Sequence, residues 1–246
     1  MELKIFKDNQ SLSAYVAAQI VETVEYKPKA LLCLATGESP LLAYEMAAAG
    51  AGERNVDFTA AYFIALDEWM GIAPEDSGSC TFFLRKHILE KLSLQHEHVH
   101  LFNGVSSNPA KDCRSADDFI RSHGPIDLMV VGIGMNGHVG FNEPGTPEDL
   151  YSHVIDLDEV TKSVGQKYFP DARNLSKGIT LGWRHIFEAR RVILIATGKH
   201  KAPIVAGSLQ GKVTAQVPAS LLRKHPGAEF CTDEAAAGEL KSDDDN

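Results

Sequence analysis

The sequence predicts a single α/β domain whose mostly parallel β-sheet is covered by helices on both faces. Short apolar runs alternate along the chain with amphipathic segments of helical period, as in repeated β-α units. Several apolar runs end in a glycine-containing turn that leads directly into a helical segment. No linker, internal repeat or low-complexity segment divides the 246 residues, and this length suits one large domain.

The elements follow in chain order from local patterns. A helix is expected where apolar residues recur every three or four positions, and a strand where a short apolar run ends in a turn. The expected elements are a helix at 11–24, a strand at 29–37, a helix at 39–50, a strand at 58–69, a helix at 81–92, a strand at 98–102, a helix at 109–124, a strand at 126–134, a helix at 159–169, a strand at 190–198, a helix at 199–209 and, within 228–238, a strand that can be followed by one helical turn.

Capping signals refine three of these elements. Ser11 or Ser13 is expected to cap the first helix. In the second helix, Pro40 is expected at the first helical position and Gly50 just past the end. The acidic end of the chain, residues 241–246, is expected to fray.

Charge and composition exclude several function classes. Lys plus Arg is 24 and Asp plus Glu is 33, so the formal net charge is 24 − 33 = −9, which disfavours binding to nucleic acid or to an anionic membrane. No apolar run approaches the roughly 18 residues of a transmembrane helix, and the charged start lacks the apolar core of a signal peptide. We therefore expect a cytoplasmic protein with free thiols at its scattered cysteines, Cys33, Cys80, Cys113 and Cys231.

The stretch "GIGMNGHVGFNEPG" at 132–145 contains the G-x-G-x-x-G pattern of dinucleotide-binding proteins. Gly132, Gly134 and Gly137 follow an apolar run, as that pattern requires. The pattern also needs a helix directly after the third glycine, because the helix N-terminus binds the pyrophosphate. Pro144 and two further glycines interrupt this segment, so we do not expect a dinucleotide cofactor.

The same stretch offers a pair of side chains for proton transfer. His138 lies close to Glu143, with Asn136 beside them. A carboxylate next to a histidine fixes the imidazole tautomer and supports its protonated form. A structural loop with a solvated histidine and glutamate is the alternative, and this stretch by itself does not decide between the two.

The segment "LATGESP" predicts a phosphate-binding loop between a strand and a helix. Backbone N–H groups and hydroxyls at a helix start bind phosphate well. An ordinary serine cap is the alternative, and an acidic side chain here suits an anion only if it points away. The loop residues are Thr36, Gly37, Glu38 and Ser39.

Two further strand ends carry charged side chains. Asp67 and Glu68 are adjacent, so on an extended segment one can face a ligand while the other serves the structure; an acid that only caps the next loop is the alternative. Lys199 or Lys201 could neutralise a phosphate at another helix start, with a solvated lysine as the alternative. All these strand ends should meet at one edge of a parallel sheet.

The segment "HEHVH" invites comparison with a zinc site. His96, His98 and His100 would share one face if the segment were a strand. No acid or cysteine completes a known spacing, so we expect an exposed strand start and no metal.

Taken together, these loops resemble the glucosamine-6-phosphate deaminase/isomerase family. The resemblance runs from "LLCLATG" to "FCTD", and the core "GHVGFNEPG" differs from the "GHTASLFP" pattern of the related 6-phosphogluconolactonases. It implies a Rossmann-like fold of the sugar-phosphate isomerase type, with 1–246 as a single catalytic domain and a mobile lid around 150–175. "LDEW", "CLATGESPLL" and "GITLG" are more similar to members called galactosamine-6-phosphate isomerases.

The resemblance also implies a reaction and a set of site residues. The reaction is conversion of glucosamine 6-phosphate or galactosamine 6-phosphate to a ketose 6-phosphate plus ammonia, without a cofactor. Asp67 matches the base at C2, His138 the ring-opening histidine, and Glu143 the carboxylate that supports it. The matched phosphate-binding residues are Thr36, Gly37, Glu38, Ser39, Lys201 and Lys167.

Two positions depart from the family pattern, and two other functions stay open. Asn136 stands where some members have aspartate, so it can orient His138 but adds no second negative charge. Lys167 stands in place of an arginine and lacks its bidentate fork. The alternatives are a 6-phosphogluconolactonase-like hydrolase and a non-catalytic sugar-phosphate-binding protein. The sequence allows a homo-oligomer.

Overall fold

The computed structural model describes residues 1–241, which fold around two β-sheets. The strands in this part of the chain are β1 (Glu2–Phe6), β2 (Leu31–Leu34), β3 (Tyr62–Ala65), β4 (Asp67–Trp69), β5 (Val99–His100), β6 (Leu128–Gly132), β7 (His153–Asp156), β8 (Lys177–Thr180), β9 (Val192–Ala196) and β10 (Ala228–Asp233). The larger sheet has the order β1-β10-β9-β6-β2-β3-β5, with every neighbouring pair parallel. This arrangement confirms the predicted α/β class.

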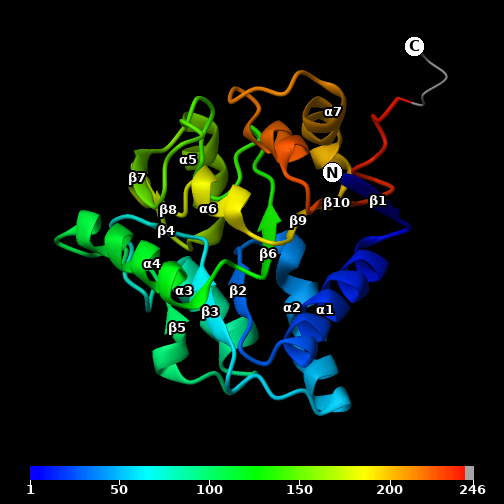
Figure 1. Cartoon of the computed structure of the whole chain (residues 1–246). Coiled ribbons are helices and arrows are strands. Elements are labelled where there is room, and N and C mark those ends of the chain that lie inside the picture. Colours follow the sequence, from blue (N-terminus) through cyan, green and yellow to red (C-terminus); the bar gives the residue numbers. More distant parts are fainter. Residues whose placement is uncertain (242–246) are drawn as a thin grey trace.

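Helices flank the larger sheet (Figure 1). They are α1 (Asn9–Tyr26), α2 (Glu38–Arg54), α3 (Cys80–Leu84), α4 (Pro109–His123), α5 (Glu159–Gly165), α6 (Trp183–Glu188) and α7 (Ala202–Gln210), with a π-helical turn at Arg85–Leu89 and 3₁₀ turns at His96–His98, Gln166–Tyr168, Lys199–Lys201 and Pro218–Lys224. α1 and α2 pack side by side and on β6, and α3 and α4 contact β3. Strands β2 and β9 are buried along their whole length, which explains their uninterrupted apolar sequences.

A smaller sheet of the order β4-β8-β7 is antiparallel and carries the segment predicted to be a lid. A second apolar cluster packs against it. The rings of Trp69 and Phe141 lie 4.6 Å apart between centroids, and Phe169 packs edge-on against Trp69. This cluster supports the end of β4 and the helix α5 that follows β7.

Three predicted boundaries are wrong. The expected strand over 58–69 is two strands in different sheets, because the chain leaves β3 at Leu66 and β4 pairs with β8 instead. Helix α2 begins before Pro40 and continues past Gly50 to a left-handed Asn55, with φ of 54°. The cap of α1 is Asp8, whose carboxylate accepts the Ser11 N–H, and not a serine.

Several short elements could not be predicted from the sequence. β1 lies at the sheet edge with two exposed apolar residues, and β7 is mostly half-buried, so neither shows a clear periodic pattern. The elements that the sequence did not predict are β1, β7, β8, α6 and the turn at Pro218–Lys224. The expectation of fraying at 241–246 falls almost entirely outside the described residues.

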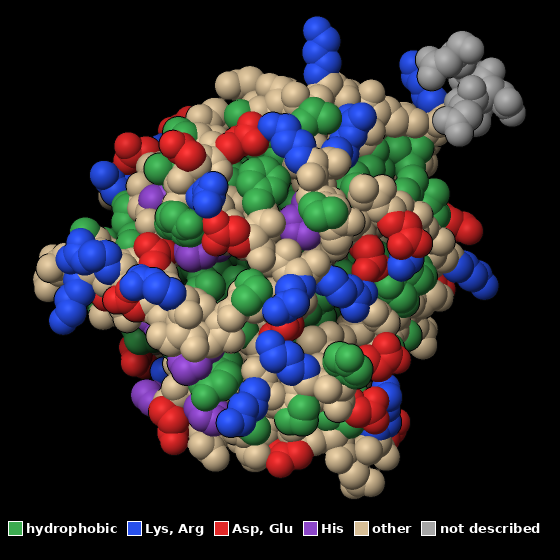
Figure 2. Space-filling view, in the orientation of Figure 1, with side chains coloured by type: hydrophobic (Ala, Val, Ile, Leu, Met, Phe, Trp, Pro, Cys, Tyr) green, Lys and Arg blue, Asp and Glu red, His purple; other side chains and the backbone are tan. Residues whose placement is uncertain are grey.

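Acidic and basic side chains are interspersed over the face of the molecule shown in Figure 2. Among residues 1–241, no helix combines the length and apolar character needed to cross a bilayer.

An ion-pair network around the buried Glu229 of β10 joins this strand to β1, to α1 and to Arg191, the residue before β9. Glu229 is 8% exposed and accepts hydrogen bonds from Lys4 at 2.8 Å, Tyr15 at 2.5 Å and Arg191 at 2.7 Å. Burial acts to raise the pKa of Glu229, but these hydrogen bonds outweigh it and lower the pKa to about 2. Ionised Glu229 therefore stabilises the fold.

Replacing Glu229 with glutamine should lower the free energy of unfolding at pH 7 by about 2–3 kcal/mol. Since the pKa of Glu229 is about 2 in the folded protein and near 4.5 when unfolded, the wild-type advantage should shrink as pH falls from 4.5 toward 2. Urea unfolding at pH 7 and pH 3 measures the difference. The control is Glu2→Gln, which removes an exposed partner of Lys4 and should cost little. A pH-independent loss in E229Q would contradict the electrostatic explanation.

Candidate active site

One pocket lies at the carboxyl ends of four neighbouring strands, β3, β2, β6 and β9. The sequence predicts this edge, because ligands bind outside the carboxyl ends of parallel strands. Most of the predicted site residues line the pocket together: Thr36, Gly37, Glu38, Ser39, Asp67, His138, Lys167 and Lys201. Asn136 and Glu143 lie behind His138 rather than on the pocket wall.

The loop at 36–39 joins β2 to the N-terminus of α2, as predicted. Gly37 precedes the helix with φ of 130°, a conformation that side-chain-bearing residues rarely adopt. The Ser39 hydroxyl lies 3.1 Å from the hydroxyl of Thr197, at the end of β9. Ser39 lies inside α2 and is not its cap, and its hydroxyl meets that of Thr197 beside the free N–H groups at the helix start.

Two lysines give this end of the pocket positive charge in an otherwise acidic chain. Lys201 is half-buried and its Nζ donates to the Ile133 carbonyl at 2.6 Å. Burial, with a contribution from the charge of Lys167, lowers the pKa of Lys201 to about 8. Lys167 pairs with Glu38 at 3.0 Å, and the Glu38 side chain is 69% exposed, so this ion pair lies in solvent at the mouth of the pocket.

Asp67 and Glu68 divide their roles as the alternation of a strand predicts. Asp67 faces the pocket and is 8% exposed. Glu68 points the other way and accepts the N–H groups of Cys80 at 3.0 Å and Thr81 at 2.9 Å, which anchors the start of α3. Burial and the neighbouring charge of Glu68 raise the pKa of Asp67 to about 7, which suits a group that must both take up and return a proton.

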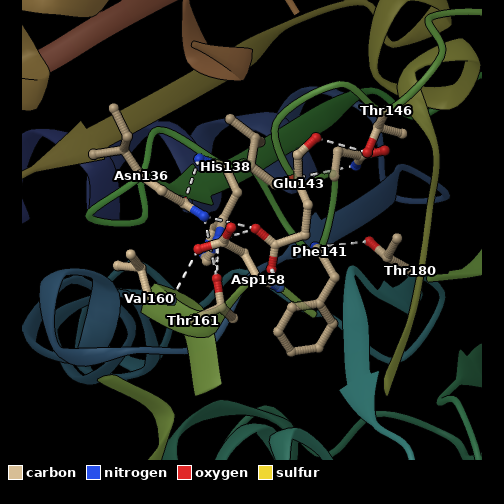
Figure 3. Close-up of polar contacts among 12 residues, drawn as sticks. Asn136, His138, Phe141, Glu143, Thr146, Asp158, Val160, Thr161 and Thr180 are labelled. Atoms are coloured by element: carbon tan, nitrogen blue, oxygen red, sulfur yellow. Dashed lines mark hydrogen bonds and ion pairs between the residues drawn. The ribbon is translucent and has the colours of Figure 1, made fainter. Parts of the chain in front are cut away.

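His138 is held by two contacts at one ring nitrogen (Figure 3). Its Nδ1 lies 2.9 Å from the Thr161 hydroxyl and 3.3 Å from Glu143 Oε2. With Nδ1 occupied, Nε2 is left to act on a ligand in the pocket. Thr161 belongs to α5, so the predicted lid segment contacts the histidine directly.

Glu143 is 4% exposed and is surrounded by donors. Burial acts to raise its pKa, but hydrogen bonds from His138, Thr161 and Asn136 and the charge of His138 lower it below the usual range. Asn136 donates to Glu143 Oε2 at 2.8 Å and accepts the backbone N–H of His138 at 3.2 Å. Asn136 therefore orients the carboxylate and the loop, whereas the sequence suggested that it orients the imidazole itself.

The glycines of 132–145 make room for this histidine. A Cβ at Gly134 would lie 2.4 Å from His138 Nε2, so only glycine allows the ring to lie against the backbone. No helix follows Gly137, as expected from Pro144 and the later glycines, because the chain continues as turns to β7. The loop thus lacks the helix start that a dinucleotide pyrophosphate needs.

The three histidines of "HEHVH" do not share one strand. His96 and His98 lie in a 3₁₀ turn and only His100 is in β5. The His98 ring packs on Tyr62 and its Nδ1 contacts the Thr59 carbonyl. Across residues 1–241, no group of three His, Cys, Asp or Glu side chains is arranged to hold a metal ion.

Sequence reasoning missed four residues of the pocket and its support. Thr197 had a usable signal, because the tripeptide Ala-Thr-Gly occurs at both 35–37 and 196–198, each time between a strand and a helix. Thr161 and Cys80 carried no such signal, because they are distant in sequence from His138 and Thr36, the residues they contact. The fourth residue, His200, adjoins the predicted Lys201 and lines the same pocket.

Comparisons with known proteins agree on one family. The family model described as "Glucosamine-6-phosphate isomerases/6-phosphogluconolactonase" matches residues 7–231. Glucosamine-6-phosphate deaminases of Rhodopirellula baltica and Shouchella clausii are 37% and 36% identical to this chain. The first alignment covers 98% of this chain and 96% of the relative, and the second covers 94% of each.

Solved structures give the same answer for the fold. The structure of a monomeric glucosamine-6-phosphate deaminase superposes with a TM-score of 0.93 at 30% identity, over 97% of this chain and 100% of that one. A 6-phosphogluconolactonase from Thermotoga maritima superposes with a TM-score of 0.74 at 21% identity, covering 94% and 98%, which is a likeness of fold alone.

Proposed function

Since the chain belongs to the family of glucosamine-6-phosphate isomerases and 6-phosphogluconolactonases, we propose that it converts a hexosamine 6-phosphate and water into a ketose 6-phosphate and ammonia. One observation carries the proposal. A single pocket combines a proton-accepting carboxyl, Asp67, with a carboxylate-supported histidine, His138, and a lysine-lined loop that suits a phosphate.

The substrate phosphate binds at the loop between β2 and α2. Helix N–H groups and the hydroxyls of Ser39 and Thr197 donate to its oxygens, and Lys201 supplies the positive charge. Lys167 exchanges its Glu38 partner for the phosphate. Because the pKa of Lys201 is about 8, phosphate binding should weaken above that pH.

Ring opening and isomerisation follow at the other end of the pocket. His138 moves the proton between the ring oxygen and the C1 hydroxyl, and Glu143 supports the protonated imidazole. Asp67 takes the proton from C2 and returns it to C1 through an enolamine. Water then adds at C2, and the C2–N bond breaks to release ammonia.

We also propose that segment 150–175 acts as the lid of this pocket, since α5 supplies Thr161 to His138 and the next turn supplies Lys167. The cytoplasmic location stays a prediction. So does a homo-oligomer, which light scattering can test; the structural relative with the TM-score of 0.93 is described as monomeric.

Ammonia release from the two epimers tests the function. We expect turnover of glucosamine 6-phosphate or galactosamine 6-phosphate, measured as ammonia formed with time. The names of the relatives favour the gluco epimer, whereas "LDEW" and "GITLG" favour the galacto epimer.

Hydrolysis of 6-phosphogluconolactone by the same preparation tests the hydrolase alternative, and binding without turnover would indicate a non-catalytic protein. Absence of ammonia from both epimers would refute the proposed reaction.

A further inference from the structure

Cys80 is a buried thiol in the pocket wall to which the proposed reaction gives no role. It is the first residue of α3, is 3% exposed, and lines the pocket with Asp67 and Thr36. The Thr36 hydroxyl donates to its sulfur at 3.3 Å, and the thiol lies close enough to the Asp67 carboxyl to act on its pKa, lowering it against the effect of burial. The sulfur therefore lies between the phosphate loop and the side chain proposed as the base.

The backbone on both sides of this contact is fixed by one carboxylate. Glu68 accepts the Cys80 N–H at 3.0 Å, and its other oxygen accepts the Ser79 hydroxyl at 2.7 Å. Glu68 directly follows Asp67 in β4. Strand β4 thus carries Asp67 and, through Glu68, anchors the start of α3, which places the thiol next to the carboxyl.

The direction of the hydrogen bonds follows from the protonation state of the thiol. Burial raises the pKa of Cys80 well above its usual value, and the charges of Glu68 and Asp67 act in the same direction. The thiol is therefore neutral and carries one proton. Because the Thr36 hydroxyl donates to the sulfur, the S–H is free to donate to Asp67.

We propose that Cys80 is a positioning residue that orients the Asp67 carboxylate, favours its ionised form and links it through Thr36 to the phosphate loop. The inference rests on the proposed function, because Asp67 must be ionised to take a proton from C2. A donor to a carboxylate favours the charged form, so loss of the thiol should make Asp67 harder to ionise.

The pH dependence of kcat/KM separates this role from a packing role. In Cys80→Ala the acidic half-point should move upward by about 0.5–1 pH unit, since a thiol is a weak donor. That shift lowers kcat/KM about 3–10-fold at pH 6 and much less at pH 9. Cys80→Ser keeps a donor and should stay near the wild-type half-point. Cys113→Ala, which removes a thiol from α4, is the matched control and should leave the profile unchanged.

A second readout does not depend on turnover. The carboxyl infrared band that differs between wild type and Asp67→Asn reports the titration of Asp67, and its midpoint should rise in C80A by the same amount as the kinetic half-point. Cys80→Val fills the space of the thiol without a donor and replaces C80A if that variant does not fold.

The outcomes distinguish the two proposals. A wild-type protein without hexosamine 6-phosphate turnover refutes the proposed function. An active wild type with an unshifted C80A profile and infrared midpoint overturns the role of Cys80. A uniform loss at all pH values, or a Ser variant shifted as far as the Ala variant, also overturns it.

Discussion

Replacing Asp67 with asparagine should abolish exchange of the C2 proton of a hexosamine 6-phosphate with solvent and lower kcat by about 10⁴-fold. Asparagine keeps the shape of the side chain but cannot accept the proton. Proton NMR in deuterium oxide measures the exchange at C2 and the appearance of deuterium at C1. Wild-type enzyme should incorporate label during turnover, and the variant should not.

The pH dependence of the wild type gives the same prediction a second test. Burial and the charge of Glu68 raise the pKa of Asp67 to about 7, and the base acts only when ionised. The kcat/KM of the wild type should therefore rise as pH increases through about 7, and fall again above about 8, where Lys201 loses its proton and phosphate binding weakens. Any residual activity of Asp67→Asn should lack this rise.

Stability provides the control for folding. The pKa of Asp67 is about 7 in the folded protein and near 3.8 in the unfolded chain, so folding free energy is lost as pH rises from about 3.8 to 7 and the full cost is present above pH 7. The asparagine variant lacks that cost, and its midpoint of thermal unfolding at pH 8 should equal or exceed that of the wild type. Asp118→Asn, on the exposed face of α4, is a matched control. Exchange that persists in folded Asp67→Asn would place the base elsewhere.

The edge of the sheet that holds the site could be predicted from strand ends alone. Apolar runs before Thr36, Gly132 and Thr197 each form a buried parallel strand, and parallel strands place their carboxyl ends together. The division of labour between Asp67 and Glu68 also follows from alternation along a strand. These predictions needed only local patterns and the rule for parallel sheets.

Contacts between distant segments could not be predicted in this way. Thr161 meets His138 across 23 residues, and Cys80 meets Thr36 across 44. Nothing in their local sequence encodes which partner they reach. The change of sheet at β4 could not be predicted either. The sequence at 58–69 resembles one continuous strand, and its periodicity does not show that the last three residues pair with β8 in the other sheet.

Replacing His138 with glutamine should lower kcat for the ring form of the substrate by about 10²–10⁴-fold, because glutamine keeps a polar group at this place but cannot transfer a proton. The loss should be much smaller for a 4,5-dideoxy analogue, whose aldehyde cannot close into a five- or six-membered ring. Such an analogue needs no ring opening, while its C2 proton still needs Asp67.

Ammonia release from the two compounds, compared between wild type and His138→Gln, isolates the ring-opening step. The ratio of the two rates should change by at least about tenfold in the variant. His123→Gln, on α4, is the control and should leave the ratio unchanged. Equal losses for both compounds would mean that His138 acts in isomerisation as well. The contact of its Nδ1 with Glu143 and Thr161 would then serve the C2 chemistry, and the separation of roles between the two ends of the pocket would be wrong.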